Sequence, residues 1–214
     1  PRSPQKIELT GTELKMGDFI KKQLANGPSL VNGAIYDITF TGADPAGNEA
    51  IPINISNVNF DNEPPVMSIS RPIDSEQIKT TIISYMSNEV LESATVIFEQ
   101  TSGTIDITSP HKISLTGREL TDGVHSDFDL GITSQLADGG RYSVSIEAVD
   151  KAGNPAKITP ISDVFFDILP PDLSLSTPVS GSHVNSHRVS YSTSEEMGKG
   201  KMIFTRIGGG EDPT

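Results

Sequence analysis

The feature that most constrains this sequence is a repeat with one constant offset. The stretch KIELTGTEL begins at Lys6 and recurs as KISLTGREL from Lys112, 106 residues later. Three more patterns recur at the same offset: DPAGN at 44–48 and DKAGN at 150–154, FDNEPP at 60–65 and FDILPP at 166–171, and SY with a later Glu at 84–89 and 190–195. Without any gap, 37 of the 108 aligned positions are identical. A fixed period of this kind indicates tandem copies of one structural unit.

Two pairs of adjacent prolines mark the boundaries between the copies. Proline lacks the N–H that a strand ladder needs and stiffens the chain, so Pro64-Pro65 and Pro170-Pro171 suit linkers. The predicted organisation is the C-terminal part of one repeat at 1–63, a complete repeat at 64–170 and the N-terminal part of the next at 171–214. The opening PRSP is neither a signal peptide nor a natural start, so we expect an internal segment of a longer protein.

Alternation of apolar and polar residues predicts seven short strands in the complete repeat. The expected strands are 66–70, 80–86, 94–100, 111–115, 127–133, 141–149 and 157–166. The residues expected to point inward are Met67, Ile69, Ile83, Tyr85, Val96, Phe98, Tyr142, Val144, Ile146 and Ala148, and those expected on one face of the fifth strand are Phe128, Leu130 and Ile132. Seven antiparallel strands separated by turn residues predict an all-β fold, a sandwich of two sheets. The first copy repeats the last two strands, with Tyr36, Ile38 and Phe40 on one and Ile55, Val58 and Phe60 on the other.

A tyrosine at the start of the sixth strand narrows the type of sandwich. Tyr142 follows a Gly turn and lies six residues after Leu136, and Tyr36 stands in the same relation to Leu30. This pattern resembles the tyrosine corner of Ig-like and fibronectin type III sandwiches, whose hydroxyl bonds back to the backbone. The chain has no Cys and no Trp, so the antibody type is excluded. The expected fold is therefore tandem seven-stranded Ig-like β-sandwich repeats with a 106-residue period.

Three motifs carry a resemblance to one family. LTGREL at 115–120, DKAGN at 150–154 and the linker VFFDILPP at 164–171 resemble the Ig-like (fibronectin/cadherin-like) repeats of large bacterial cell-surface adhesins and biofilm-associated proteins. The resemblance covers the whole chain. It implies an extracellular structural extender or adhesion module on the bacterial cell surface, with neighbouring repeats as partners and calcium as a stiffening ion.

The same resemblance prompts a search for calcium ligands at the linkers. In an Ig-like sandwich the second and sixth strands end where the incoming linker arrives, and Ca²⁺ takes six to eight oxygen ligands. The candidate ligands are Asp61, Glu89, Asp150 and Asn154 at the first junction, and Asp167 and Glu195 at the second. The alternative is turn chemistry alone, because Asp-x-Ala-Gly-Asn makes a tight turn without any ion.

Composition excludes several other functions. With no Cys, disulfides, thiolate metal sites and a cysteine nucleophile are ruled out. A net charge of −12 argues against nucleic acid and anionic lipid as partners, and no apolar run is long enough for membrane insertion. None of the four His recurs at the 106-residue offset, which leaves no shared His-based triad or metal site. We therefore expect no enzyme activity.

Two further possibilities follow from the same features. A carbohydrate- or ligand-binding accessory module of a secreted protein is the alternative function, although few aromatic residues remain outside the predicted core. Residues 1–63 and 171–214 each hold part of a sandwich and together hold one whole repeat. We therefore expect self-association in which 1–63 of one molecule pairs with 171–214 of another.

Overall fold

The computed structural model describes residues 4–210, and these residues form strands, loops and two short 3₁₀ helices. The all-β prediction is confirmed. The chain divides into two compact units, Pro1–Phe166 and Asp167–Thr214. The first unit contains strands β1 to β10, and the second contains β11 and β12.

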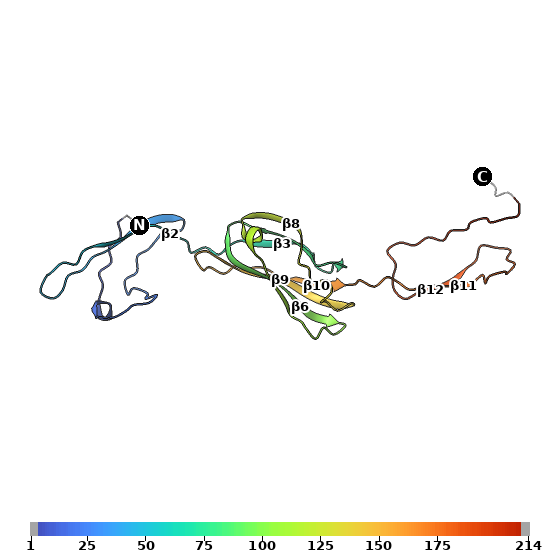
Figure 1. Cartoon of the computed structure of the whole chain (residues 1–214), viewed down its shortest axis with the longest axis horizontal. Coiled ribbons are helices and arrows are strands. Elements are labelled where there is room, and N and C mark those ends of the chain that lie inside the picture. Colours follow the sequence, from blue (N-terminus) through green and yellow to red (C-terminus); the bar gives the residue numbers. More distant parts are fainter. Residues whose placement is uncertain (1–3, 211–214) are drawn as a thin grey trace. The chain divides into compact units, whose positions relative to one another are not determined.

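Residues of the predicted complete repeat form two sheets (Figure 1). The first sheet has three antiparallel strands in the order β3 (Met67–Arg71), β5 (Ile82–Ser87) and β8 (Gly123–Asp129). The second has five, in the order β4 (Gln77–Ile78), β10 (Ile161–Phe166), β9 (Gly140–Asp150), β6 (Leu91–Gly103) and β7 (His111–Ser114). β4 runs parallel to β10, and the other pairs are antiparallel.

The two sheets enclose one hydrophobic core. Side chains alternate inward and outward along a strand, so every second residue of β9 is buried, from Tyr142 to Ala148. These residues pack with members of both sheets, and the largest fully buried side chains include Tyr85, Phe98, Tyr142 and Phe166. All of the inward residues predicted for β5, β6 and β9 are buried. Burial of this apolar face holds the two sheets together.

Three strand predictions need correction. The fifth strand was expected at 127–133, but β8 ends at Asp129 because the Asp129 carboxylate accepts the N–H of Gly131, whose φ is +69°. The last strand was expected from residue 157, but β10 begins at Ile161, directly after Pro160. β4 was missed, because two residues are too few to show alternation. Leu130 and Ile132 are nonetheless buried as expected.

The N-terminal part of the first unit is a hairpin with an open apolar face. β1 (Ala34–Phe40) pairs antiparallel with β2 (Ile53–Phe60), and the 3₁₀ helix η1 (Gly11–Leu14) precedes them. Ile38 and Phe40, which were expected to point inward, are 49% and 56% exposed. Among the residues that the structure describes, no second sheet pairs with this hairpin, and the apolar side chains of its strands are not enclosed in a core.

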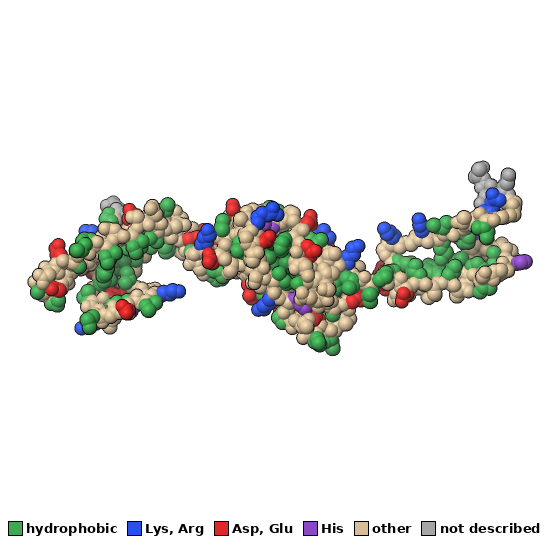
Figure 2. Space-filling model, viewed as in Figure 1, with side chains coloured by type: hydrophobic (Ala, Val, Ile, Leu, Met, Phe, Trp, Pro, Cys, Tyr) green, Lys and Arg blue, Asp and Glu red, His purple; other side chains and the backbone are tan. Residues whose placement is uncertain are grey.

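The second unit is also a hairpin. β11 (Leu173–Thr177) pairs antiparallel with β12 (Ser190–Thr193), and the described residues after β12 contain no further strand. Leu173, Leu175 and Tyr191 are 66%, 60% and 59% exposed. Figure 2 shows hydrophobic side chains open to solvent along this unit and along the N-terminal hairpin.

Local structures recur at positions 106 residues apart. The 3₁₀ helix η2 (Gly117–Leu120) matches η1, and in both the N–H of the preceding Thr donates to the Glu carboxylate at the third helical position. The hydroxyl of Tyr36 accepts the N–H of Val31, and the hydroxyl of Tyr142 accepts the N–H of Ala137. In both copies the tyrosine hydroxyl thus bonds to the backbone N–H of the residue five positions upstream.

Candidate metal centre

The turn after β9 is organised by the carboxylate of Asp150, which is 2% exposed. Its Oδ1 accepts the N–H groups of Ala152, Gly153 and Asn154 at 2.8, 2.7 and 2.8 Å. Its Oδ2 accepts the side-chain amide of Asn154 at 2.8 Å. Gly153 has a φ of +96°, a region that glycine adopts without steric cost. The carboxylate therefore accepts four hydrogen bonds inside the turn, three at Oδ1 and one at Oδ2.

The linker enters beside this turn. The Asn154 amide also donates to the backbone oxygen of Asp61 at 3.3 Å, so Asn154 joins the linker to the turn. The neighbouring turn between β5 and β6 contributes Glu89, whose backbone oxygen accepts the hydroxyl of Ser87 at 2.7 Å. Asn88 holds the linker at Val66 through two backbone-directed hydrogen bonds. Three segments distant in the sequence thus meet at one end of the sandwich.

Carboxylate oxygens of Asp61, Glu89 and Asp150 all lie within 4.8 Å of one another. Two ligands of one Ca²⁺ ion, each about 2.4 Å from it, are at most about 5 Å apart. The spacing of the three oxygens is therefore compatible with a shared calcium ion. Carboxylates without imidazole or thiolate also suit a hard cation rather than zinc.

The electrostatics of the three carboxylates differ. Burial and the negative charges of Asp61 and Asp150 raise the pKa of Glu89 above its ordinary value. Burial alone would also raise the pKa of Asp150, but its hydrogen bonds to Asn154 and to the turn backbone outweigh burial and lower it. Among residues 4–210, none of the ion pairs involves these three carboxylates. A cation at this position would relieve the repulsion between like charges.

Asn154 joins the turn to the linker through its amide nitrogen, which donates to the Asp150 carboxylate and to the Asp61 backbone oxygen. It thereby orients both acidic residues, and its role as a calcium ligand stays a prediction.

The first copy contains the same turn without the acidic cluster. Asp44 Oδ1 accepts the N–H groups of Ala46 and Asn48, both at 2.9 Å, and Oδ2 accepts the Asn48 amide at 2.8 Å. The side-chain and backbone hydrogen bonds from Asn48 lower the pKa of Asp44. The Asp44 turn is therefore held by hydrogen bonds between its own residues.

The candidate residues at the second junction are not brought together with a third carboxylate in the described part of the chain. Asp167 is the first residue of the second unit. Glu195 lies after β12, where its backbone oxygen accepts the hydroxyl of Thr193 at 2.8 Å. The position 106 residues after Asp150 exceeds the 214 residues of the sequence.

A buried polar cluster was not predicted. Asp106 Oδ2 accepts hydrogen bonds from the hydroxyl of Tyr142 at 2.8 Å and from Nε2 of His111 at 2.7 Å. Asp106 Oδ1 accepts both the N–H and the hydroxyl of Thr108. The residue 106 positions after Asp106 is Asp212, which lies outside the described residues. The contact does not recur as a sequence pattern, because the residue equivalent to His111 in the first copy is Gln5.

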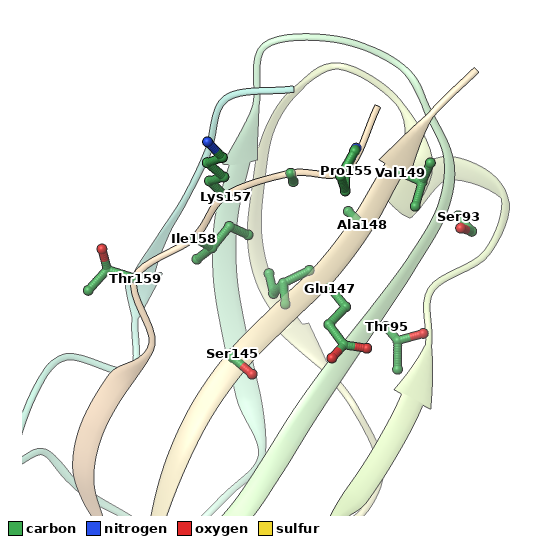
Figure 3. A pocket seen from close by; sticks show the side chains of 12 residues that line it. Ser93, Thr95, Ser145, Glu147, Ala148, Val149, Pro155, Lys157, Ile158 and Thr159 are labelled. Atoms are coloured by element: carbon green, nitrogen blue, oxygen red, sulfur yellow. The ribbon is translucent and has the colours of Figure 1, made fainter. Parts of the chain in front are cut away.

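An open groove lies on the outer face of the five-stranded sheet (Figure 3). Its volume is about 720 Å³. Ser93 and Thr95 of β6, Ser145 and Glu147 of β9, and the segment 155–159 line it. The lining contains no aromatic residue.

No protein-family model matches this chain, and a search of curated proteins finds no match. Within residues 4–210, no helix has the length and apolar character needed to cross a membrane.

Proposed function

We propose that this chain consists of tandem seven-stranded Ig-like repeats that act as a structural extender or adhesion segment of a large bacterial cell-surface protein. The observation that carries the proposal is the recurrence of the same local structures 106 residues apart. It includes the 3₁₀ helices, the tyrosine hydrogen bonds and the Asp-x-Ala-Gly-Asn turns. The proposed role is mechanical, since repeated sandwiches joined by short linkers add length.

The arrangement of the strands supports an Ig-like assignment. A three-stranded sheet of the first, second and fifth long strands faces a sheet of the third, fourth, sixth and seventh. The short β4 adds parallel to the last strand, as an extension of the first strand that crosses to the other sheet. In this proposal the domains are 1–63, 64–170 and 171–214, with the Pro-Pro pairs in the linkers.

Calcium would stiffen the junction between the first two repeats. Asp61, Glu89 and Asp150 would hold the ion, and the Asp61 backbone and solvent would supply further oxygens. An ion shared between a linker residue and two loops of one domain would restrict the angle between neighbouring domains. Asp167 and Glu195 would serve the next junction in the same way.

The stiffening can be tested by spin-label distances in the full chain. Because the protein has no Cys, the substitutions Glu49→Cys and Ser126→Cys place one label in the first copy and one on β8, both at exposed positions. We expect the distance distribution to narrow in calcium relative to chelator. Distance distributions of equal width in calcium and in chelator would refute the calcium part of the proposal. The extender role would then be supported by the repeated local structures alone.

The groove on the five-stranded sheet is the observation that favours the second candidate, a carbohydrate-binding accessory module. Its volume suits a small ligand, and Ser145 and Glu147 provide polar groups. Sugar-binding sites, however, gain from aromatic faces, and this lining has none. A glycan array probed with the full chain separates the two functions. A carbohydrate-binding module should give a saturable glycan signal that Glu147→Ala abolishes, whereas an extender should give no such signal.

A further inference from the structure

At both junctions, the residue directly after the two prolines is held by one residue of the next turn. Asn88, directly after β5, accepts the N–H of Val66 through Oδ1 at 2.7 Å and donates its own N–H to the Val66 oxygen at 3.1 Å. Ser194, directly after β12, accepts the N–H of Asp172 through its hydroxyl oxygen at 2.8 Å and donates its own N–H to the Asp172 oxygen at 3.0 Å. Both backbone polar groups of Val66 and of Asp172 are therefore bonded.

The two junctions make the same contact with different side chains. Val66 and Asp172 lie 106 residues apart, and so do Asn88 and Ser194. Neither pair is identical in type, so the sequence repeat does not reveal the contact. An amide oxygen and a hydroxyl oxygen both accept a backbone N–H, as they do at helix N-caps. The contact therefore depends on a side-chain acceptor at this position and not on one residue type.

The other end of the first linker is held by a turn of the preceding repeat. Gly33 donates its N–H to the Phe60 oxygen at 2.8 Å, and Oδ1 of Asn32 accepts the N–H of Asn62 at 2.9 Å. Gly139, the equivalent of Gly33, donates its N–H to the equivalent of Phe60 at 2.9 Å. The first linker is thus bonded to a turn on each side.

Little torsional freedom remains between these two ends. Glu63 donates its N–H to Oδ1 of Asp61 at 3.1 Å, which closes a turn over Asn62. Pro64 has a fixed φ, and each proline restricts the residue before it to extended values of ψ. Pro65 is fully buried. The φ of Glu63 is consequently the least restricted torsion of the linker.

We propose that Asn88 and Ser194 are positioning residues that fix the direction in which each linker meets its repeat, so that the joint is stiff before any ion binds. This arrangement, the linker lock, consists of the side-chain acceptor, the residue it holds and the two prolines before that residue. Its use in adding length rests on the proposed extender role, whereas the lock itself needs no calcium.

Spin-label distances measured in chelator test the linker lock. The chain has no Cys, so Asn59→Cys on β2 and Ser126→Cys on β8 place one exposed label on each side of the first linker. Glu92→Cys with Ser126→Cys gives a reference pair inside the central repeat. Labelled chain is diluted with an excess of unlabelled chain, so that the distances lie within one molecule. We expect the pair across the linker to give one peak of a width comparable to that of the reference pair.

Two variants at position 88 isolate the side-chain oxygen. Asn88→Ala removes the acceptor of the Val66 N–H and should broaden the distribution across the linker at least about twofold, because the linker becomes more flexible. Asn88→Ser, which introduces the residue type found at position 194, should keep the distribution narrow. Val66 is 61% exposed, so water can replace the lost bond, and both variants should keep the Tm of the central repeat and the width of the reference pair.

The outcomes separate the linker lock from the calcium site. The lock is overturned by a wild-type distribution that is broad in chelator, by an Asn88→Ala distribution as narrow as that of the wild type, or by an Asn88→Ser distribution as broad as that of Asn88→Ala. A wild-type distribution that is narrow in chelator and unchanged by calcium would support the lock and count against the ion. Narrowing that occurs only in calcium would overturn the lock and support the ion.

Discussion

The calcium site makes a prediction that one substitution tests. Glu89→Gln removes one carboxylate of the three and leaves the Asp150 turn intact, because no hydrogen bond of that turn involves Glu89. Without calcium, we expect the variant to be as stable as the wild type or slightly more stable. The physical reason is that burial and the charges of Asp61 and Asp150 raise the pKa of Glu89, which reports a penalty on its ionised form.

Calcium should reverse this order. A ligand present at a hundredfold excess over its Kd stabilises the folded state by about 2.7 kcal/mol. Calcium sites of extracellular modules have a Kd of about 10⁻⁴ to 10⁻³ M, so roughly 10 mM calcium approaches this limit. For a domain of about 100 residues, 1 kcal/mol shifts Tm by about 4 °C, so the wild type should gain up to about 10 °C. The variant should gain little.

Differential scanning calorimetry suits the measurement because the chain contains no Trp. Magnesium at equal concentration controls for ionic strength. Asp44→Asn is the matched control, since Asp44 makes the same turn in the first copy but lies outside the acidic cluster, and this variant should keep the full calcium response. A wild-type Tm that is the same in calcium and chelator, or a Glu89→Gln variant that retains the shift, would refute the reasoning.

Three further predictions concern stability, each measured by chemical or thermal unfolding of the full chain. Phe98→Ala should lower the free energy of unfolding by about 3–5 kcal/mol, because Phe98 is fully buried. Phe204→Ala, at the equivalent exposed position, should leave unfolding of the central repeat unchanged. Equal losses of stability in the two variants would contradict the assigned core. Gly103→Ala should destabilise the fold by more than about 2 kcal/mol, because Gly103 has a φ of +82° and the added Cβ would lie 2.3 Å from the Gly139 oxygen. Gly131→Ala should cost only about 1 kcal/mol, because Gly131 has a φ of +69° but no neighbour within 4 Å of the added Cβ. Burial opposes the ionisation of Asp106, but the hydrogen bonds from His111, Thr108 and Tyr142 prevail and lower its pKa. The stability that ionised Asp106 contributes to the folded state is therefore present above the ordinary aspartate pKa and is lost as pH falls below about 4. Asp106→Asn should lower Tm at pH 7 and flatten the loss of stability in acid. An unaltered dependence of Tm on pH in acid would show that another group controls it.

Alternation in the sequence predicted most of the central core. Tyr85, Phe98 and Tyr142 were expected to point inward and are fully buried. The strand ends were less predictable. β8 begins at Gly123, four residues before the expected start, and it ends at Asp129, where the carboxylate of Asp129 accepts the N–H of Gly131, whose φ is positive. Apolar alternation carries no information on either end.

Part of the candidate site could also be predicted. The recurrence of Asp44 and Asp150 within the same pentapeptide indicated the turn, and both carboxylates accept the expected backbone hydrogen bonds. The direction of the Asn154 amide could not be predicted, because it depends on the position of the Asp61 backbone. The contact of His111 with Asp106 was equally hidden, since no pattern in one strand reports which side chain a neighbouring loop presents.

The sequence by itself determined the 106-residue period, the all-β character, the tyrosine hydrogen bonds and the residues suited to a core, because all of these follow from local patterns of residue type. Only the tertiary structure decided which of those residues are buried. Phe98 is enclosed by two sheets, whereas Phe204, with the same residue type at the equivalent position, is 71% exposed, because the strands that would cover it are not beside it. Tertiary packing likewise brought Asp61, Glu89 and Asp150 within 4.8 Å, since the three lie on segments that meet only when the sandwich closes.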